Sequence, residues 1–303
     1  MSETFALGDG LSHTEYSLFR DSLPDSLKGR IVSAEQLAIG WLETRSGSEM
    51  TVYPQICQIA HEILAEGLST AVIQPGVTTT SDVAWWYRER VRQLGLSAGF
   101  HPSVSIQRAA APEKDMKSAV DKPHDEELIL PGDLLHVDFG ISYLRLNTAT
   151  QQHAYILRAG ETEAPEGLRK ALARGNRLQD ILTANFVAGR TGNEILAQSL
   201  KQAKGEGITA SIYTHPIGYH GHAAGPRIAL WDQQDGVPGA GDYPLHANTA
   251  HSVELYAESE IPEWGSKVHI MLEEDAFFDG TSTRYIDGRQ TQLLLIPRLW
   301  RAP

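Results

Sequence analysis

Apolar residues recur at the spacing of amphipathic helices in the first hundred positions of the chain. In residues 54–68 they fall on one side of a helix with 3.6 residues per turn, at Ile56, Ile59, Ala60, Ile63 and Leu64. Two further helices are predicted over residues 33–42 and 79–94. Each of these ranges opens with the three-residue spacing of a capping box, in Ser33 with Gln36 and in Thr79 with Asp82.

From Phe100 onward the pattern changes to the alternation that is typical of half-buried strands. Residues 103–106 alternate polar and apolar side chains, which predicts a strand. Residues 129–141 and 154–157 predict two neighbouring strands. The mixed charges of residues 112–127 predict a loop between the strand at 103–106 and the strand at 129–141.

Helical signals return in the second half of the chain. Pro165 stands at a predicted first helical position, and Thr191 with Glu194 caps the next predicted helix, which ends at Gly205. Strand-like runs follow, so the second half repeats the order of the first. We predict an α+β fold with one catalytic domain over residues 31–303. Residues 1–30 are polar and are interrupted by glycine and proline, and we interpret them as a lead segment.

Composition narrows the function classes. The 303 residues carry a formal charge of −12, which argues against nucleic acid as a partner. No apolar run approaches the ~20 residues of a membrane span, and the N-terminus lacks the basic and apolar regions of an export signal. Cys57 is the only cysteine, so an internal disulfide is excluded. We therefore expect a cytoplasmic protein with no membrane partner, in which Cys57 is a packing residue.

Four polar residues stand at the polar steps of otherwise apolar, strand-like runs. They are Asp138, His215, Glu254 and Glu273. Any one carboxylate of this kind is usually a surface residue. Taken together, hard oxygen donors and one imidazole held on rigid strands form the ligand set of a hydrolytic metal centre.

The order of these four residues resembles the creatinase/methionine-aminopeptidase family of metallopeptidases, which have the pita-bread fold. The resemblance is strongest to the Xaa-Pro dipeptidase and aminopeptidase branch and extends from about Ser33 to Arg298. Its most specific parts are PGDLLHVDFG at 131–140 and HPIGYHGHAAGP at 215–226. It implies a curved, mostly antiparallel sheet with flanking helices and pseudo-two-fold symmetry. The chain before Asp138 is too short for the separate N-terminal domain of many Xaa-Pro peptidases, so we expect none.

The resemblance also implies five metal ligands in the order Asp, Asp, His, Glu, Glu, and here the second Asp is missing. It should stand eleven residues after Asp138, where the chain has Ala149. The neighbouring residues match the family segment Asp-x-Gln-Arg-x-Ala-Tyr, which fixes the alignment. Because that Asp bridges both ions in the family, we expect its loss to disturb both sites. The sequence leaves open whether the loss is natural or engineered.

Further roles follow from the same resemblance. His222, seven residues after His215, corresponds to a histidine that contacts the scissile group, and Glu254 is both ligand and proton carrier. His124, after Pro123, matches a substrate-facing histidine, although its spacing from Asp138 also fits a surface loop. Glu273 competes with Glu274 for the last ligand position, and the apolar triplet Ala276-Phe277-Phe278 favours Glu273.

The resemblance implies two divalent ions (manganese, cobalt, zinc or iron), a peptide or dipeptide substrate and a homodimer. With Ala149, we expect one weakly held ion or none. The leading hypothesis is a peptidase that cleaves Xaa-Pro bonds and is impaired by Ala149. The alternatives are a metal-free hydrolase of the creatinase kind and a catalytically inert binding module on the same fold.

Overall fold

The computed structural model describes residues 4–109 and 126–298. In chain order, the helices are η1 (Ala6–Gly8), α1 (His13–Ser22), α2 (Asp25–Lys28), α3 (Glu35–Glu43), α4 (Gly47–Gly67), α5 (Thr80–Gln93), α7 (Glu166–Ala184), α8 (Gly192–Gly205) and η2 (Ala240–Asp242). The strands of the first half are β1 (Ser97–Ala98), β2 (Ser103–Gln107), β3 (Leu134–Phe139), β4 (Ile141–Tyr143), β5 (Leu146–Asn147) and β6 (Thr150–Ile156). Those of the second half are β7 (Thr209–Ile212), β8 (His215–Pro216), β9 (Thr249–Ser252), β10 (Leu255–Ile261), β11 (Ser266–Leu272), β12 (Asp275–Phe278), β13 (Thr283–Tyr285) and β14 (Leu294–Ile296).

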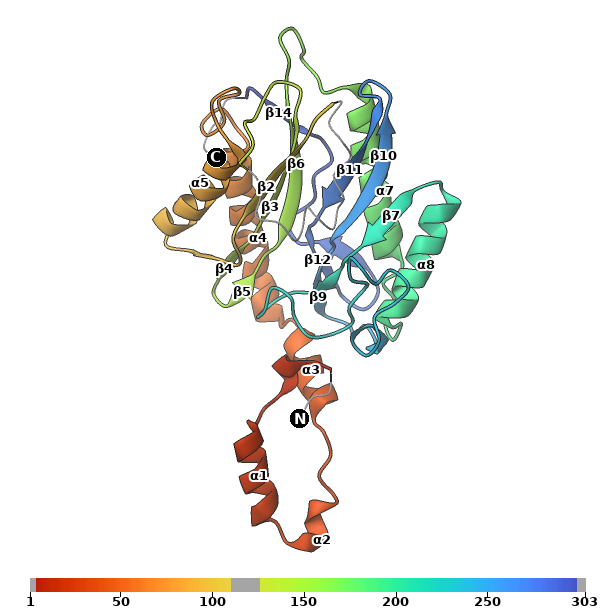
Figure 1. The fold of residues 1–303 in the computed structure, drawn as a ribbon. Helices are drawn as coiled ribbons and strands as arrows, with labels where there is room; N and C mark the ends of the chain where they lie inside the picture. The colour runs from red at the N-terminus through yellow and green to blue at the C-terminus, as the bar shows by residue number, and fades with distance from the viewer. Residues whose placement is uncertain (1–3, 110–125, 299–303) are drawn as a thin grey trace.

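The body of the molecule consists of two similar halves, each a small sheet with two helices on its outer face (Figure 1). In the first half, α4 and α5 pack on the sheet of order β14-β6-β3-β2. In the second half, α7 and α8 pack on the sheet of order β11-β10-β7. Strands β8, β9, β12 and β13 form a further sheet, and only the β14–β6 pair is parallel among the described strand pairs. This is the α+β, mostly antiparallel, pseudo-two-fold arrangement predicted above.

Each half has its own hydrophobic core. One core joins the buried faces of α7 and α8 to β10 and β11, with Leu172, Leu196 and Ile270 among its members. The other core joins α4 and α5 to β3 and β6, and its members include Ile56 and Tyr87. Strands β6 and β11 bring the two halves together, and a backbone bridge between Gln151 and Glu273 connects them. The line of contact between the halves is where the predicted ligands lie.

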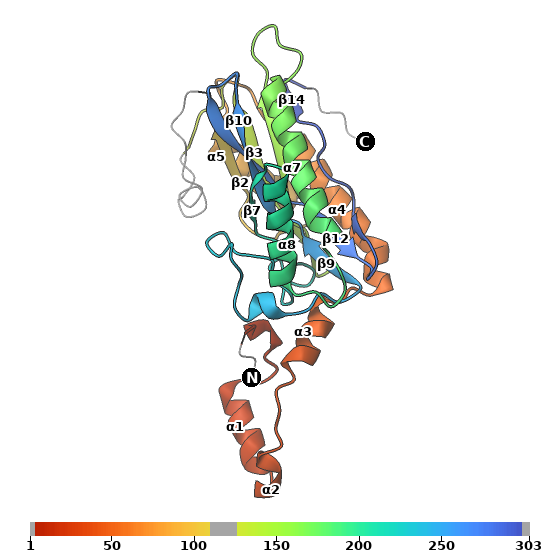
Figure 2. The same cartoon turned by 90° about the vertical axis from the view of Figure 1, so that its right-hand side faces the viewer.

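The lead segment contains helices, which the sequence analysis missed. Helix α1 begins at a capping box formed by Ser12 and Glu15, and neither α1 nor α2 contains a buried residue. Figures 1 and 2 show residues 9–34 as an arm that extends away from the body. Among residues 4–109 and 126–298, no helix has the length and apolar character needed to cross a bilayer.

Several predicted helix boundaries need correction. Helix α4 begins at Gly47 instead of Pro54, because Ser46 and Glu49 form a capping box that starts it two turns earlier. Helix α3 starts after Ala34 without a side-chain cap, so the predicted Ser33–Gln36 box does not form. Pro165 precedes α7 as its N-cap and is not its first residue. The capping boxes predicted before α5 and α8, and the end of α8 at Gly205, are confirmed.

The packing of α4 against α5 generates a stability prediction. A Cβ at Gly67 would overlap the ring of Tyr87, which is fully buried and donates its hydroxyl to the Leu64 carbonyl at 2.8 Å. We expect Gly67→Ala to lower the free energy of unfolding by about 1–3 kcal/mol. At Gly40, inside α3, a Cβ meets nothing within 4 Å, so Gly40→Ala should raise it by about 0.5–1 kcal/mol through helix propensity. Urea denaturation of both variants measures these free energies. Equal changes in the two variants would contradict the close contact between Gly67 and Tyr87.

Candidate metal centre

The predicted ligands come from five different places and meet between the two halves. Asp138 lies in β3, Ala149 immediately before β6, and His215 at the start of β8. The two glutamates are not inside strands, as the sequence pattern suggested, but at breaks between them. Glu254 separates β9 from β10, and Glu273 precedes β12 after the end of β11. At these breaks the neighbouring apolar residues stay in the core while the carboxylates turn inward.

His215 is fully buried, and its tautomer follows from its contacts. Its Nδ1 lies 3.0 Å from the Pro216 carbonyl oxygen, which can only accept, so Nδ1 carries the proton. The lone pair is therefore on Nε2, which has no hydrogen-bond partner among the described residues. Burial lowers the pKa of this imidazole well below its usual value, and nearby His222 lowers it further. The neutral ring aims a free lone pair into the site.

Two carboxylates face that lone pair. The Nε2 atom of His215 lies 3.9 Å from Glu254 Oε2 and 3.8 Å from Glu273 Oε1. These distances exceed hydrogen-bond length and the ring is neutral, so neither contact is a salt bridge. The ligand atoms of the three residues lie within 4.8 Å of one another. Ligands of one tetrahedral ion are about 3.4 Å apart, so the three donors fit a single divalent ion closely.

Burial and mutual repulsion act on the acidic groups of the centre. Burial raises the pKa of Glu254 well above its usual range, and the charges of Glu273 and Asp138 add to the effect. Burial also raises the pKa of Glu273, to about 7, although hydrogen bonds from Ser252 and Gln151 oppose the rise. Burial and the nearby Glu273 raise the pKa of Asp138. Its Oδ1 atom is buried and has no hydrogen-bond partner among the described residues. A bound cation would stabilise all three ionised carboxylates.

Position 149 supplies no ligand atom. The Ala149 methyl lines the cavity of the site, and its backbone N–H donates to Asp275 Oδ2 at 3.3 Å. The Asp275 carboxylate is buried and also accepts a hydrogen bond from the Cys57 thiol at 3.6 Å. Burial raises the pKa of the Cys57 thiol, in agreement with its predicted packing role. A second ion would therefore have only Asp138 and a share of Glu273, so the residues present fit one ion and not two.

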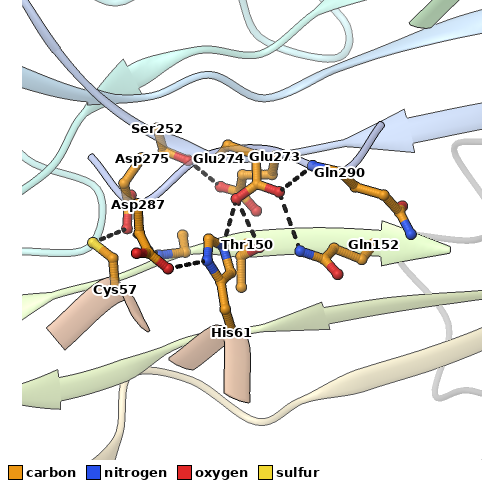
Figure 3. Close-up of polar contacts among 11 residues, drawn as sticks. Cys57, His61, Thr150, Gln152, Ser252, Glu273, Glu274, Asp275, Asp287 and Gln290 are labelled. Atoms are coloured by element: carbon orange, nitrogen blue, oxygen red, sulfur yellow. Dashed lines mark hydrogen bonds and ion pairs between the residues drawn. The ribbon is translucent and has the colours of Figure 1, made fainter. Parts of the chain in front are cut away.

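Glu273 and Glu274 point to opposite sides of the chain. Glu273 faces the centre and accepts the Ser252 hydroxyl at 2.5 Å, whereas Glu274 points away from it (Figure 3). The Oε2 atom of Glu274 lies 2.7 Å from Nε2 of His61, whose Nδ1 lies 2.8 Å from Asp287 Oδ2. This arrangement supports Glu273 over Glu274 as the ligand.

Glu274 has further partners of its own. Thr150, Gln152 and the backbone N–H of Gln290 all donate to its carboxylate. No local pattern marks His61, which lies in α4 more than two hundred residues before its partner Glu274. Its carboxylate contacts are found only once the fold places α4 behind the centre.

A cavity of about 360 Å³ opens beside the centre. Its lining includes the carboxylate residues Asp138, Glu254 and Glu273 and the aromatic residues Phe100, Tyr213 and Trp231. His222 also lines it, and the His222 and His215 rings lie 4.2 Å apart. The Tyr213 hydroxyl lies 3.4 Å from His222 Nδ1, which leaves Nε2 for a substrate. His124 lies outside the described residues.

Two further cavity residues were missed as functional candidates. Gln151 is buried between Glu254 and Glu273, and His136 contacts its side-chain oxygen at 2.9 Å. Both stand in motifs that the resemblance already marked, Gln151 two residues after Ala149 and His136 two before Asp138. The alternation of a strand places residues two apart on one face, and this signal could have identified them.

Two pseudo-symmetric α+β halves with carboxylates and an imidazole around the cavity between them are the arrangement of the pita-bread class. The model of the metallopeptidase family M24 matches residues 54–275. The chain belongs to this family. A search of curated proteins finds no match.

Solved structures agree with this fold. An X-Pro aminopeptidase from Thermotoga maritima is 17% identical over 94% of this chain and 73% of its own, with a TM-score of 0.68. An Xaa-Pro dipeptidase from Bacillus anthracis is 20% identical over 95% of this chain and 73% of its own, with a TM-score of 0.66. A methionine aminopeptidase from Thermotoga maritima is 15% identical, covering 81% of this chain and 99% of its own, with a TM-score of 0.57. At these identities the likeness shows the fold.

His61 generates a prediction on pH. Burial lowers the pKa of its imidazole, but the carboxylates of Glu274 and Asp287 outweigh burial and raise it to about 10. Because the folded pKa exceeds the unfolded value of about 6.5, the stabilisation is complete below pH ~6.5 and is lost as the pH rises toward 10. We expect the free energy of unfolding to fall by an amount on the order of 3 kcal/mol over this window.

Urea denaturation at pH 6.5, 8 and 10 measures this loss, and the difference between wild type and His61→Gln isolates the contribution of His61. His13→Gln, at an exposed histidine, is the matched control and should follow wild type. Parallel pH profiles for wild type and His61→Gln would show that His61 is not a charged partner of Glu274.

Proposed function

We propose that this chain is a peptidase for peptides with proline in the second position, and that Ala149 reduces its centre to one ion. The observation that carries the proposal is the cluster of His215, Glu254 and Glu273, with a free imidazole lone pair facing two carboxylate oxygens. A buried neutral imidazole set against two carboxylates has no structural purpose without a cation between them.

A divalent ion bound by these residues supplies Lewis acidity and acidifies water at neutral pH. The remaining work belongs to the protein side chains. Burial raises the pKa of the Glu254 carboxyl above its usual range, which suits a group that takes a proton from water and passes it to the leaving amine. His222, with Nδ1 beside the Tyr213 hydroxyl, presents Nε2 to the carbonyl oxygen of the scissile bond. Phe100, Tyr213 and Trp231 offer an apolar wall for the substrate.

The inert binding module is the second candidate, and Ala149 favours it. The cavity and its aromatic wall would still bind a peptide, while the missing bridging carboxylate would prevent hydrolysis. A metal-free hydrolase of the creatinase kind has less support, because three of the metal-ligand residues converge on one point with donor spacing suited to an ion. The cytoplasmic setting inferred from the single cysteine remains a prediction.

We predict that Ala149→Asp creates a two-ion hydrolase. Ala149 is among the residues that line the cavity, so the new carboxylate would be introduced at the cavity wall. This carboxylate would neutralise the repulsion between two ions and fix their separation. Titration with Mn²⁺ should change from one ion to two per chain, and hydrolysis of Xaa-Pro dipeptides or longer Xaa-Pro peptides should rise by at least 100-fold, equivalent to about 2.7 kcal/mol of transition-state stabilisation.

Ala149→Asn is the matched control, because it has the same shape without the charge. It should bind one ion and stay close to wild type in activity. If Ala149→Asp binds no second ion and remains inert on both substrate sets, the peptidase assignment gives way to the binding role.

We also propose that the protein is a homodimer, as its family resemblance implies. The arm offers apolar surface for a second copy, because Leu18, Phe19 and Leu27 are 67%, 46% and 40% exposed. Light scattering at micromolar concentration should give twice the 33.3 kDa of one chain. The double variant Leu18→Ser/Phe19→Ser should shift the protein toward monomer, whereas Leu144→Ser, at an apolar residue of the body that is 59% exposed, should not. A monomeric wild type would refute the assembly.

A further inference from the structure

Gln151 lies between the two glutamates of the centre and uses both N–H donors and the oxygen of its carboxamide in hydrogen bonds. Its Nε2 donates to Glu254 Oε1 at 2.8 Å and to Glu273 Oε2 at 3.0 Å. Its Oε1 lies 2.9 Å from Nε2 of His136. The side chain is 4% exposed, so these bonds are not shared with bulk water. Among the described residues, Gln151 is the side chain that donates hydrogen bonds to both glutamates.

In each glutamate, one carboxylate oxygen accepts from Gln151 and the other faces His215. Glu254 Oε1 and Glu273 Oε2 are held by Gln151. The other two oxygens, Glu254 Oε2 and Glu273 Oε1, are the ones that face His215 Nε2. A carboxylate turns easily about its last bond, whose torsion has a broad energy minimum. By holding one oxygen of each pair, Gln151 leaves the other oxygen on the His215 side, where the Ser252 hydroxyl also donates to Glu273 Oε1 at 2.5 Å.

His136 determines which way the carboxamide points. Its Nε2–H donates to the Gln151 oxygen, so the NH₂ group faces the carboxylates, where both of its hydrogens are used. The reversed carboxamide would place an oxygen against two carboxylates and would leave the His136 donor facing an NH₂ group. The backbone reinforces this position, because the N–H of Gln151 donates to the Glu273 carbonyl at 2.9 Å.

The same bonds bear on the second ion position. In the ligand scheme of the family resemblance, a second ion is bound by Asp138, by the carboxylate missing at Ala149, and by the Glu273 oxygen that the first ion leaves free. That oxygen is Oε2, to which Gln151 donates. Asp138 and Gln151 are paired residues on adjacent strands, so the carboxamide lies on the Asp138 side of the centre. With no ligand atom at position 149, nothing in the described residues competes with the carboxamide for Oε2.

We propose that Gln151 is the positioning residue that builds a one-ion site from His215, Glu254 and Glu273, and that its carboxamide holds the Glu273 oxygen that a second ion would need. The inference uses the metal-binding part of the proposed function and does not require peptidase activity. Partners of this kind orient metal ligands, and their loss typically weakens metal binding 10–100-fold.

Calorimetric titration of the chelator-treated full chain with Mn²⁺ tests the proposal. Wild type should bind one ion per chain, Gln151→Met should bind about 10–100-fold more weakly, and His215→Ala should not bind. Gln152→Met is the matched control, because Gln152 is the next residue on β6, points to the opposite side and donates to Glu274 at 3.3 Å. It should bind as wild type does. Equal affinities for Gln151→Met and wild type, or two ions or none in wild type, would overturn the proposal.

A second variant covers the case in which Gln151→Met fails to fold. Gln151→Glu has nearly the same shape but places a third carboxylate beside Glu254 and Glu273. It should lower the thermal midpoint of the ion-free chain, and Mn²⁺ should raise that midpoint by more than it does in wild type. An equal Mn²⁺-induced rise in both proteins would count against the role of Gln151.

The two proposals fail separately. If the affinities follow the expected order while Ala149→Asp remains inert on Xaa-Pro peptides, the positioning role stands and the peptidase assignment is wrong. If Ala149→Asp is active while Gln151→Met binds Mn²⁺ as tightly as wild type does, the peptidase assignment stands and the positioning role is wrong.

Discussion

Three carboxylates buried side by side between two halves of the fold are the constraint on which the centre depends. Burial removes Asp138, Glu254 and Glu273 from the water that would stabilise their charges and raises the pKa of each, and the charge of Glu273 raises the pKa of Asp138 and of Glu254 further. A folded protein can hold three buried carboxylates together only if hydrogen-bond donors or a cation stabilise their charges. The described residues provide uncharged donors at close range, chiefly Ser252 and Gln151, and they keep the imidazole of His215 neutral. The net negative charge that remains is the physical basis for binding a divalent ion.

The fold places positive charge one layer away from this centre. His61, raised in pKa by its two carboxylate partners, neutralises Glu274 and not Glu273. Consecutive residues therefore have opposite surroundings: one carboxylate is paired with a protonated imidazole and the other is left for an ion. The alternation of side chains along an extended chain produces this separation, because neighbouring residues point to opposite faces. If the cation faced Glu273 instead, it would compete with a metal for the same oxygens.

Much of the fold and part of the centre could be predicted from the sequence. The capping boxes at Thr79 and Thr191, the strand at 103–106 and the order of ligand-bearing runs are local signals, and local signals persist into the structure. The starts of α1 and α4 were equally local, in the Ser12–Glu15 and Ser46–Glu49 spacings, and could have been found. The glutamate partners of Gln151 and the carboxylate partners of His61 could not, because hydrogen bonds between residues more than a hundred positions apart depend on how the two halves pack.

The structure around Ala149 shows that the fold does not depend on a metal ligand at this position. The backbone N–H of Ala149 still donates to buried Asp275, and the strand that follows keeps its full register with β3. The segment is therefore held by its main chain and by neighbours such as Thr148 and Thr150, which are buried. A carboxylate at position 149 would point into the cavity, where folding does not need it and where its charge would add to that of three others. With Ala149 the ion-free protein is spared that repulsion, so this chain would fold around its centre at a lower cost than the Ala149→Asp variant would.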